Sequence, residues 1–378
     1  MYKLYKSLPL SIQSRYLRLD ENNIRKSIEE LDIFVNSPHM KYINTLKFSK
    51  DVLFSHELRA NNCIEGYRDD VEVINEVIRK SSGINDTDRK LRILNLYKGY
   101  KYILKRNNID KDTLKHLYDI LSNGLLSSGD IRYMGEYYRE KPVYIYYSEN
   151  VCLEPDQGVD AYNIDYYMNH LLDFINSNNE CLSKTELFVK SQILHFYFVY
   201  VHPYFDINGR TSRTTSMWYL LNNKAYPFII FNRAIQLYKP EYYKVIRDVK
   251  LYANITYFIN YMMKHVVEEL EKDYIMETIK NTSNEKLTSL DYQTLHYILS
   301  MKSQKTYLDF ASLYNCHNDK KKITNIYHEM LLPLIDKEIL IPGRSTNKQI
   351  SGIMNNHFFT INPNLYDNDP DKIKCIKL

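Results

Sequence analysis

A capped apolar run near the middle of the chain is the sequence feature that most constrains its fold. Ser183-Lys184-Thr185-Glu186 has the capping-box pattern that opens a helix, and apolar residues dominate from Leu187 to Val201. His202-Pro203 ends this helix, because proline disfavours helical geometry in the residue before it. A second helix is expected from near Gly209 to a point before Pro227. The segment therefore predicts two core helices joined by a short loop.

The rest of the chain also favours helices. Only 10 glycines and 11 prolines occur in 378 residues, and apolar residues recur at three- and four-residue steps from Ile24 to Leu31 and from Val71 to Ile78. Pro142 to Tyr147 is the exception, since its β-branched and aromatic residues predict a strand or a hairpin arm. We therefore expect a mainly α fold that contains a β-hairpin.

Composition excludes several classes of protein. Hydrophobic residues make up 44% of the chain and charged residues 25%, which is ordinary for a globular protein. The net charge of +4, from 50 basic and 46 acidic residues, is too small to indicate nucleic-acid binding by its field alone. Five scattered cysteines predict neither a disulfide framework nor a zinc site. Neither a signal peptide nor an apolar run of ~18–20 residues is found, so we expect a cytoplasmic protein without a membrane partner.

The carboxy-terminal part predicts a separate module over residues 286–365, after a polar linker at Lys280 to Lys286. Three helix-like stretches precede two segments that resemble hairpin arms: Tyr292–Met301, Tyr307–Tyr314, Lys321–Leu334, 339–344 and 357–361. This order is typical of a winged-helix-like domain. Lys320-Lys321-Lys322 could contact phosphates, although basic and acidic residues nearly balance in this part. A DNA-binding regulator is thus an alternative function, and a protein-binding or dimerisation module is another.

The loop between the two core helices carries residues suited to phosphate chemistry. The amino terminus of a helix offers free N–H groups to a phosphate, and Gly209 allows close approach. Asp206 is a hard oxygen ligand of the kind that Mg²⁺ prefers. Arg210 and Arg213 share one helix face and can both reach a polyphosphate. His202 can accept a proton from an attacking hydroxyl near neutral pH.

Each of these features also has a common structural explanation. A His-Pro pair is usually a helix boundary, and Asn-Gly is usually a turn. Their joint order in His202 to Arg213 is much more specific, and it resembles the H-x-F-x-(D/E)-G-N-(G/K)-R-x-x-R signature of Fic-family AMP-transferases. Three further matches support the resemblance, which covers about residues 1–270: His195 with Phe198, Gly135 to Arg139, and Pro240 to Tyr243.

The resemblance implies a helical Fic fold, with ATP as substrate and Mg²⁺ as cofactor. His202 would be the general base toward a Tyr, Thr or Ser hydroxyl of a protein, which could be this chain itself. Asp206 would bind Mg²⁺. The nucleotide would be held by Ile207, Asn208, Gly209, Arg210, Arg213 and Tyr242, with Tyr242 stacked on adenine. Gly209, where a phosphoryl-transferring subgroup has lysine, favours AMP transfer. A homodimer is a further possibility that the resemblance raises.

Three residues depart from the family pattern. Ile207 stands where the family has its first glycine, and a β-branched residue is costly there if φ must be positive. Tyr204 replaces the usual phenylalanine and brings a hydroxyl that must be accommodated. Lys250 occupies a place where relatives often carry a small polar residue near the adenine. These departures bear on the catalytic rate rather than on the fold.

An inhibitory helix is expected ahead of the signature. The family's motif is (S/T)-x-x-x-E-(G/N), and residues 61–66 supply Glu65 and Gly66, with Asn61 in place of Ser or Thr. The resemblance implies a Glu65–Arg213 pair that competes with the γ-phosphate. Alternatively, Glu65 is a solvated residue before a helix-ending glycine, or it positions water in an enzyme that removes AMP.

The segment with Val143 and Ile145 resembles the family's flap, which would receive a target segment as an added strand. It could equally be an ordinary packed hairpin. The expected organisation is therefore an amino-terminal helical region with the inhibitory motif (1–110), a Fic core (111–275) and the winged-helix-like domain (286–365).

Overall fold

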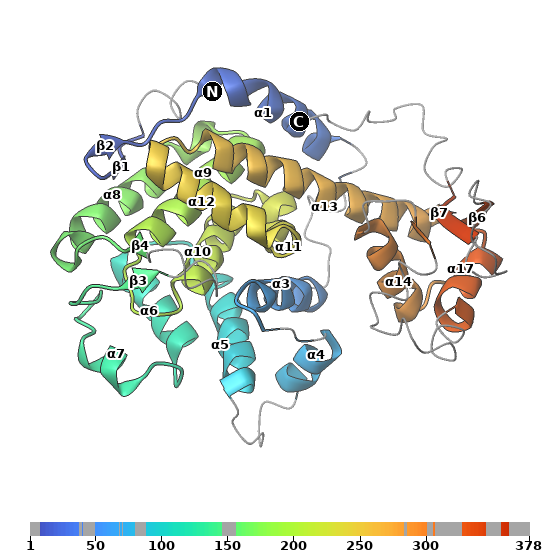
Figure 1. Ribbon diagram of the computed structural model, residues 1–378, viewed down its shortest axis with the longest axis horizontal. Coiled ribbons are helices and arrows are strands. Elements are labelled where there is room, and N and C mark those ends of the chain that lie inside the picture. The colour runs from blue at the N-terminus through green and yellow to red at the C-terminus, as the bar shows by residue number, and fades with distance from the viewer. Residues whose placement is uncertain are drawn as a thin grey trace. The chain divides into compact units, whose positions relative to one another are not determined.

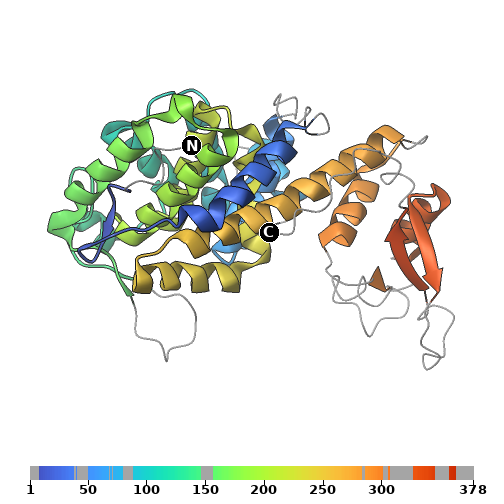
Figure 2. The same cartoon turned by 90° about the horizontal axis from the view of Figure 1, so that it is seen from above.

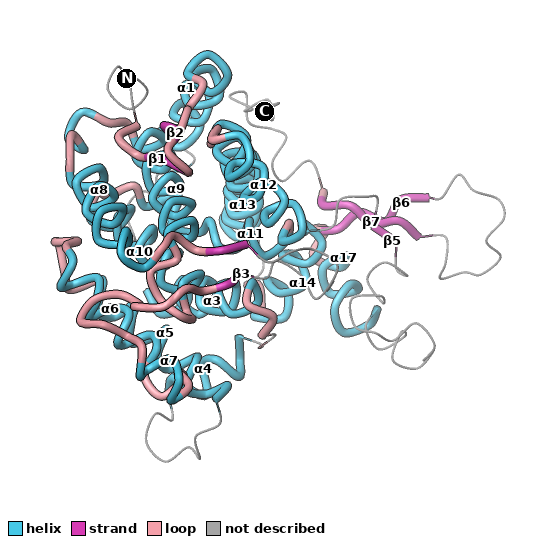
Figure 3. Tube along the Cα trace, turned by 60° about the vertical axis from the view of Figure 1, so that its left-hand side comes forward, coloured by secondary structure: helices cyan, strands magenta, loops and turns pink. Residues whose placement is uncertain are grey.

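The computed structural model describes residues 8–37, 40, 50–67, 69, 71–79, 88–145, 156–282, 286–300, 305–306, 327–344 and 357–362. These residues form two compact units, one ending at Val267 and the other beginning at Glu268. Helices dominate both units and the strands are short (Figures 1 and 3). The expectation of a mainly α fold is confirmed.

The first unit is built around a central pair of helices, α9 (Lys184–Val201) and α10 (Asn208–Asn222). The surrounding helices are α1 (Glu21–Asn36), α3 (Lys50–Ile64), α4 (Val71–Arg79), α5 (Asp88–Ile103), α6 (Lys111–Ser122), α7 (Ser128–Arg132), α8 (Ile164–Asn176), α11 (Phe231–Leu237) and α12 (Lys239–Tyr252). Single turns of 3-10 helix lie at Ala161–Asn163, Asn179–Cys181 and Tyr226–Ile230. The boundary between the units lies within α13 (Thr256–Thr282).

The central helix α9 is buried on every side. Every residue from Thr185 to Val201 is buried, including the polar Lys190, Gln192 and His195, as expected of a helix whose apolar residues lie on all of its sides. Its start is the predicted capping box, in which the Ser183 hydroxyl accepts from the Glu186 N–H and the Glu186 carboxylate accepts from the Ser183 N–H. Helices α1, α8 and α10 pack on it. Figure 2, the view from above, shows α1 in blue across the near face of the unit.

Helix α10 is buried as deeply but is rich in polar residues. Several of its hydroxyls donate to carbonyl oxygens: Thr211 Oγ1 to Ile207 (2.8 Å), Thr215 Oγ1 to Thr211 (2.8 Å) and Ser216 Oγ to Ser191 (3.1 Å). The buried Thr214 hydroxyl has no hydrogen-bond partner among the described residues. A buried helix with this composition must have its polar groups hydrogen-bonded or in contact with a ligand. The two core helices predicted from sequence are thus confirmed, and the second is polar for a reason that concerns the site.

Two short hairpins lie in the first unit. Strands β1 (Ser11–Ile12) and β2 (Arg15–Tyr16) pair with each other, and the Tyr197 hydroxyl of α9 donates to the Ser11 carbonyl (3.1 Å). Strands β3 (Tyr144–Ile145) and β4 (Asp156–Gln157) pair antiparallel, which confirms the predicted strand; Tyr146 and Tyr147 lie outside the described residues.

The second unit contains α14 (Ser289–Ser300), a π-helical turn (Tyr327–Leu331), α17 (Leu332–Asp336) and an antiparallel sheet of β5 (Lys305–Thr306), β7 (His357–Ile361) and β6 (Leu340–Arg344). The two predicted hairpin arms pair as β6 and β7. Its core is apolar and includes Ile279, Leu295, Leu331 and Ile361. Because Ile279 packs there, α13 continues into the expected linker and ends only at Thr282.

Several expectations for the second unit fall on undescribed residues. Tyr307–Tyr314, Lys320 to Lys322 and the first part of Lys321–Leu334 lie outside the described residues. The winged-helix-like assignment therefore stays a prediction. Across the described parts of the chain, none of the helices combines the length and apolar character that crossing a bilayer requires.

Candidate active site

His202 lies where α9 ends and the loop begins. Its backbone is left-handed (φ 52°, ψ 61°), and its N–H donates to the Phe198 carbonyl (2.9 Å). Nδ1 is 3.3 Å from the Val199 carbonyl oxygen, which can only accept, so Nδ1 carries the proton. Burial lowers the pKa of His202 to about 3 against this hydrogen bond, with the nearby Lys250 and Arg139 charges acting in the same direction. The ring is therefore neutral, with its lone pair on Nε2.

Arg139 fixes the backbone around His202. Its Nε donates to the His202 carbonyl (2.8 Å), its Nη1 to the Lys141 carbonyl (2.7 Å) and its backbone N–H to the Pro203 carbonyl (3.0 Å). Burial lowers the pKa of Arg139 to about 10, which still leaves the guanidinium charged at neutral pH. Its Nη2 donates to the Val159 carbonyl, just after β4, so Arg139 joins the base of the β3–β4 hairpin to the loop. Sequence matching of Gly135 to Arg139 did not reveal these contacts.

Asn208 and Asp206 shape the loop. The Asn208 side chain accepts from the Tyr204 N–H (3.0 Å) and donates to the Tyr204 carbonyl (2.8 Å), while Asp206 Oδ1 accepts from the Ile207 N–H (2.6 Å). Ile207 has φ 66° and ψ 7° and is only 2% exposed. The positive φ expected to be costly for isoleucine is thus present, and its buried side chain offsets that cost.

Tyr204 is buried under the loop with its ring stacked on Tyr118, at 3.5 Å between ring centroids. Among the described residues its hydroxyl has no hydrogen-bond partner. The hydroxyl that replaces the usual phenylalanine hydrogen is therefore accommodated sterically but without a polar contact.

The first turn of α10 presents Gly209 and Arg210. N–H groups in the first turn of a helix have no intrahelical partners, and the dipole adds positive character. A Cβ on Gly209 would lie 2.7 Å from Glu65 Oε1, so glycine leaves room for the Glu65 carboxylate. Arg210 is 6% exposed, and within the described residues its buried Nε has no hydrogen-bond partner. A buried, unpaired guanidinium nitrogen at a helix amino terminus is suited to an anion.

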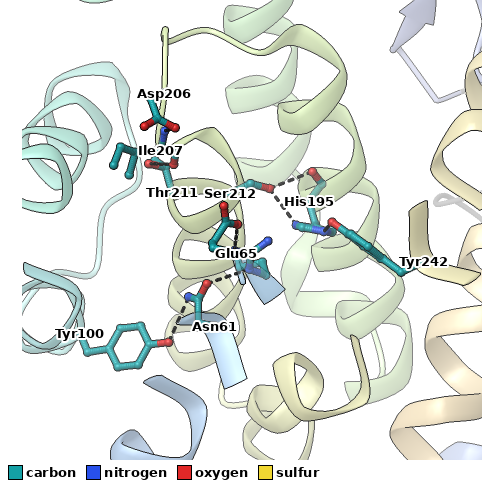
Figure 4. Close-up of polar contacts among 10 residues, drawn as sticks. Asn61, Glu65, Tyr100, His195, Asp206, Ile207, Thr211, Ser212 and Tyr242 are labelled. Atoms are coloured by element: carbon teal, nitrogen blue, oxygen red, sulfur yellow. Dashed lines mark hydrogen bonds and ion pairs between the residues drawn. The ribbon is translucent and has the colours of Figure 1, made fainter. Parts of the chain in front are cut away.

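Arg213 is held by Asn61 in α3 and by Glu65 just after it, both of which are labelled in Figure 4. Its Nη2 forms an ion pair with Glu65, and its Nε donates to Asn61 Oδ1 (2.8 Å). Asn61 in turn donates from Nδ2 to the Tyr100 hydroxyl (3.3 Å). The structure therefore brings together the Glu65 and Arg213 that the sequence paired, and it adds Asn61 as a direct partner of Arg213.

Glu65 lies in a strongly positive environment. Burial raises the pKa of its carboxyl, but Arg213, Arg210 and Lys239 outweigh this and hold it below its ordinary value. The Glu65 side chain is 27% exposed and that of Arg213 only 2%. At neutral pH the pair is thus ionised, and it places a negative charge among cations that could otherwise contact a phosphate.

His195 and Tyr242 form a buried chain behind α10 (Figure 4). Because the Ser212 hydroxyl donates to the His195 carbonyl (2.8 Å), it must accept from His195 Nδ1–H (2.8 Å). His195 Nε2 then accepts from the Tyr242 hydroxyl (2.8 Å). Burial lowers the pKa of His195 well below its ordinary value, with Arg213 acting in the same direction, which agrees with a neutral ring.

Of the predicted tyrosine pair, Tyr242 is 2% exposed and Tyr243 is partly exposed. Burial raises the pKa of Tyr243 to about 12, and the charges of Glu65 and Arg213 also act on it. The same two charges also act on Tyr242, so the two tyrosines differ in exposure: Tyr242 is buried and Tyr243 reaches the surface. The sequence pointed to the pair, but helical phase relative to the core was needed to distinguish its members.

Val143 and Ile145 lie at the base of the β3–β4 hairpin. Gly158 N–H donates to the Val143 carbonyl (3.1 Å), and Val159 N–H donates to the Val201 carbonyl at the end of α9 (3.2 Å). A Cβ on Gly158 would lie 2.9 Å from Val143 Cγ1 and 3.1 Å from His202 Cβ. The hairpin base is thus packed beside His202.

Asp206 is exposed at the loop, with Oδ1 hydrogen-bonded to backbone. No cluster of three or more His, Cys, Asp or Glu side chains suited to a metal occurs among the residues that the structure describes. Mg²⁺ at nucleotide sites is commonly held by one or two carboxylates together with substrate phosphates. The donor set therefore fits a magnesium ion that arrives with a nucleotide.

The fold and site together define a helical protein with a histidine-containing anion loop. Residues 108–220 match the model of the Fic/DOC family, so the chain contains a Fic/DOC family domain. The structure is similar to a Fic family protein from Desulfovibrio desulfuricans G20 (TM-score 0.52, 18% identity, covering 90% of this chain and 95% of that one). It is also similar to Fic-1 (residues 134–508) from C. elegans (TM-score 0.50, 15% identity, covering 69% and 73%). At these identities the likeness shows the fold, and the expected Fic fold is confirmed.

Proposed function

We propose that this protein transfers AMP from ATP to a Tyr, Thr or Ser hydroxyl of a protein. The observation that carries the proposal is the placement of a neutral His202 at the start of a loop that leads into the α10 amino terminus, where the buried Nε of Arg210 has no hydrogen-bond partner among the described residues. The Fic/DOC domain supports the same class of reaction, since members of this family are commonly transferases.

The chemical step uses the Nε2 lone pair of His202. The substrate hydroxyl oxygen attacks the α-phosphorus of ATP while Nε2 accepts the hydroxyl proton. A bond forms between this oxygen and the α-phosphorus, the bond from that phosphorus to the oxygen bridging to the β-phosphate breaks, and pyrophosphate leaves. The hydrogen bond from Nδ1 to Val199 keeps the ring in the tautomer that this step requires.

The phosphates would be held by the first turn of α10. Its free N–H groups, Gly209 and Arg210 supply donors, and Arg213 can add a second guanidinium once it is released from Glu65. Asp206 would hold Mg²⁺, which supplies charge neutralisation on the phosphates when bound. The role of the protein is then mainly positioning and electrostatic stabilisation.

Glu65 acts in this proposal as an internal inhibitor. Its carboxylate occupies Arg213 and is always present at high effective concentration, so it competes with the γ-phosphate of ATP. Two of the cations that lower the pKa of Glu65, Arg213 and Arg210, are the groups proposed to hold the phosphates. Low basal activity is therefore expected of the native protein.

Intact-mass spectrometry after incubation with ATP and Mg²⁺ tests the proposal. Glu65→Gly should gain mass equal to one or more AMP groups, or transfer AMP to an added protein, while Glu65→Gly with His202→Ala should not. Equal modification of both variants, or none in either with ATP bound, contradicts it. Loss of AMP from a modified protein would instead indicate the reverse, AMP-removing reaction.

A further inference from the structure

A buried lysine of α12 contacts the β3–β4 hairpin. Lys250 Nζ lies 3.0 Å from Asp156 Oδ2, and Asp156 is opposite Ile145 in the pairing of β4 with β3. The Lys250 side chain is 9% exposed, whereas that of Asp156 is 41% exposed. Because an ammonium group is rarely buried without an opposite charge, this contact stabilises both partners.

The described part of the hairpin, two residues in each strand, depends on such contacts, because an isolated two-stranded hairpin is at best marginally stable in water. On one side, the Val159–Val201 hydrogen bond and Arg139 attach the hairpin base to the end of α9. The Lys250–Asp156 pair attaches strand β4 to a different helix, so the hairpin is fixed at two places.

The end of α12 is itself fixed. Arg15 of β2 donates from Nη2 to the Lys250 carbonyl (3.3 Å) and from Nη1 to the Leu251 carbonyl (3.1 Å). These bonds restrain the helix end that carries Lys250. The amine is also close enough to His202 for its charge to contribute, after burial, to the low pKa of that histidine.

We propose that Lys250 and Asp156 form a clasp that holds the β3–β4 hairpin beside His202 and so positions the hydroxyl-bearing segment of the protein substrate. The effect of the clasp on catalysis rests on the proposed AMP transfer. Lys250 is a positioning residue here: it acts on the substrate through the hairpin. Loss of the clasp should therefore impair use of the protein substrate and leave ATP binding intact.

Hydrogen–deuterium exchange of the full-length chain tests the clasp without any assay of activity. Lys250→Met and Asp156→Asn should each speed exchange at the Gly158 and Val159 amides about tenfold, between the effects typical of exposed and buried ion pairs. The double variant should exchange no faster than either single one, and Lys250→Arg should stay near native. Lys244→Met is the matched control, because Lys244 pairs with Asp248 on the same helix but is exposed.

Transfer measured in the Glu65→Gly background supplies the second readout. Lys250→Met should lower kcat/KM for the protein substrate about tenfold and leave ATP affinity within about twofold, while Lys244→Met changes neither. Native exchange in both Lys250→Met and Asp156→Asn overturns the clasp. If the variants exchange faster but transfer AMP normally, the clasp does not position the substrate. If Glu65→Gly itself transfers no AMP, the proposed function is wrong, and the exchange result alone tests the clasp. If Lys250→Met does not fold, the half-exposed Asp156→Asn gives the same comparison.

Discussion

Removal of the Glu65 charge should activate the protein. Glu65→Gln keeps the size of the side chain and removes only its charge, while Glu65→Gly removes both. In either variant Arg213 Nη2 loses its ion-pair partner, whereas Asn61 still accepts from Nε. Arg213 is then restrained but free to contact the γ-phosphate, and a negative charge beside that phosphate is gone.

The size of the effect follows from burial. Exposed ion pairs contribute about 0–1 kcal/mol and breaking a buried pair costs about 3–5 kcal/mol. Here one partner is 2% exposed and the other 27%, and the competing phosphate also gains from the missing repulsion. We expect about 1–2 kcal/mol in productive ATP binding, which corresponds to about five- to thirtyfold more AMP transfer.

The assay is ATP-dependent AMP incorporation, with ATP affinity measured by calorimetry. Glu21→Gln serves as the control, because it breaks another glutamate–arginine pair, with Arg25, on the partly exposed surface of α1. Adding Arg213→Ala to Glu65→Gly should abolish the gain, because the released residue is no longer present. If both Glu65 variants leave incorporation and ATP affinity at native levels, Glu65 is not an inhibitor.

Further expectations concern the loop. His202→Ala should abolish transfer in the Glu65→Gly background but keep ATP affinity in calorimetry; near-native self-modification would exclude it as the base. Asp206→Ala and Arg210→Ala should each weaken binding of ATP with Mg²⁺ as well as turnover, and unchanged values in both would remove them from the site. Because the pKa of His202 in the folded protein is about 3, the ring stays neutral as the pH is lowered through 6.5, and the transfer rate should not fall there. A fall in the pH–rate profile with a midpoint near pH 6.5 would show that His202 has the pKa of an ordinary histidine. The free energy of unfolding of Ile207→Gly, measured by denaturant titration, should exceed that of Ile207→Ala by up to about 1 kcal/mol, since only glycine adopts φ 66° without strain. Ile207→Gly should also raise transfer if isoleucine constrains the loop. The opposite order of stabilities would show that residue 207 is not strained.

Much of the fold was predictable because local chemistry marks helix ends. The capping box at Ser183 and the proline after His202 fixed both ends of α9, and both are observed. The start of α10 lies at Asn208, next to the predicted Gly209. Such signals involve neighbouring residues, so sequence alone carries them.

The contacts that organise the site were harder to predict, since they join residues far apart in the chain. In the sequence, Asn61 was notable only because it replaces the Ser or Thr of the inhibitory motif. Its amide oxygen accepts a hydrogen bond from Arg213, 152 residues away. Arg139 bonds the His202 carbonyl across 63 residues, and Lys250 reaches Asp156 across 94. Periodicity indicates which face of a helix is buried but does not name the partner on the neighbouring element.

The position of a label in ATP tests the proposed transfer most directly. Glu65→Gly would be incubated in parallel with ATP labelled at the α-phosphorus and with ATP labelled at the γ-phosphorus, with Glu65→Gly plus His202→Ala as control. Transfer of AMP predicts protein-bound label from the α position alone, equimolar pyrophosphate, and neither in the control. Protein-bound label from the γ position, or α label that persists without His202, would contradict AMP transfer by this histidine.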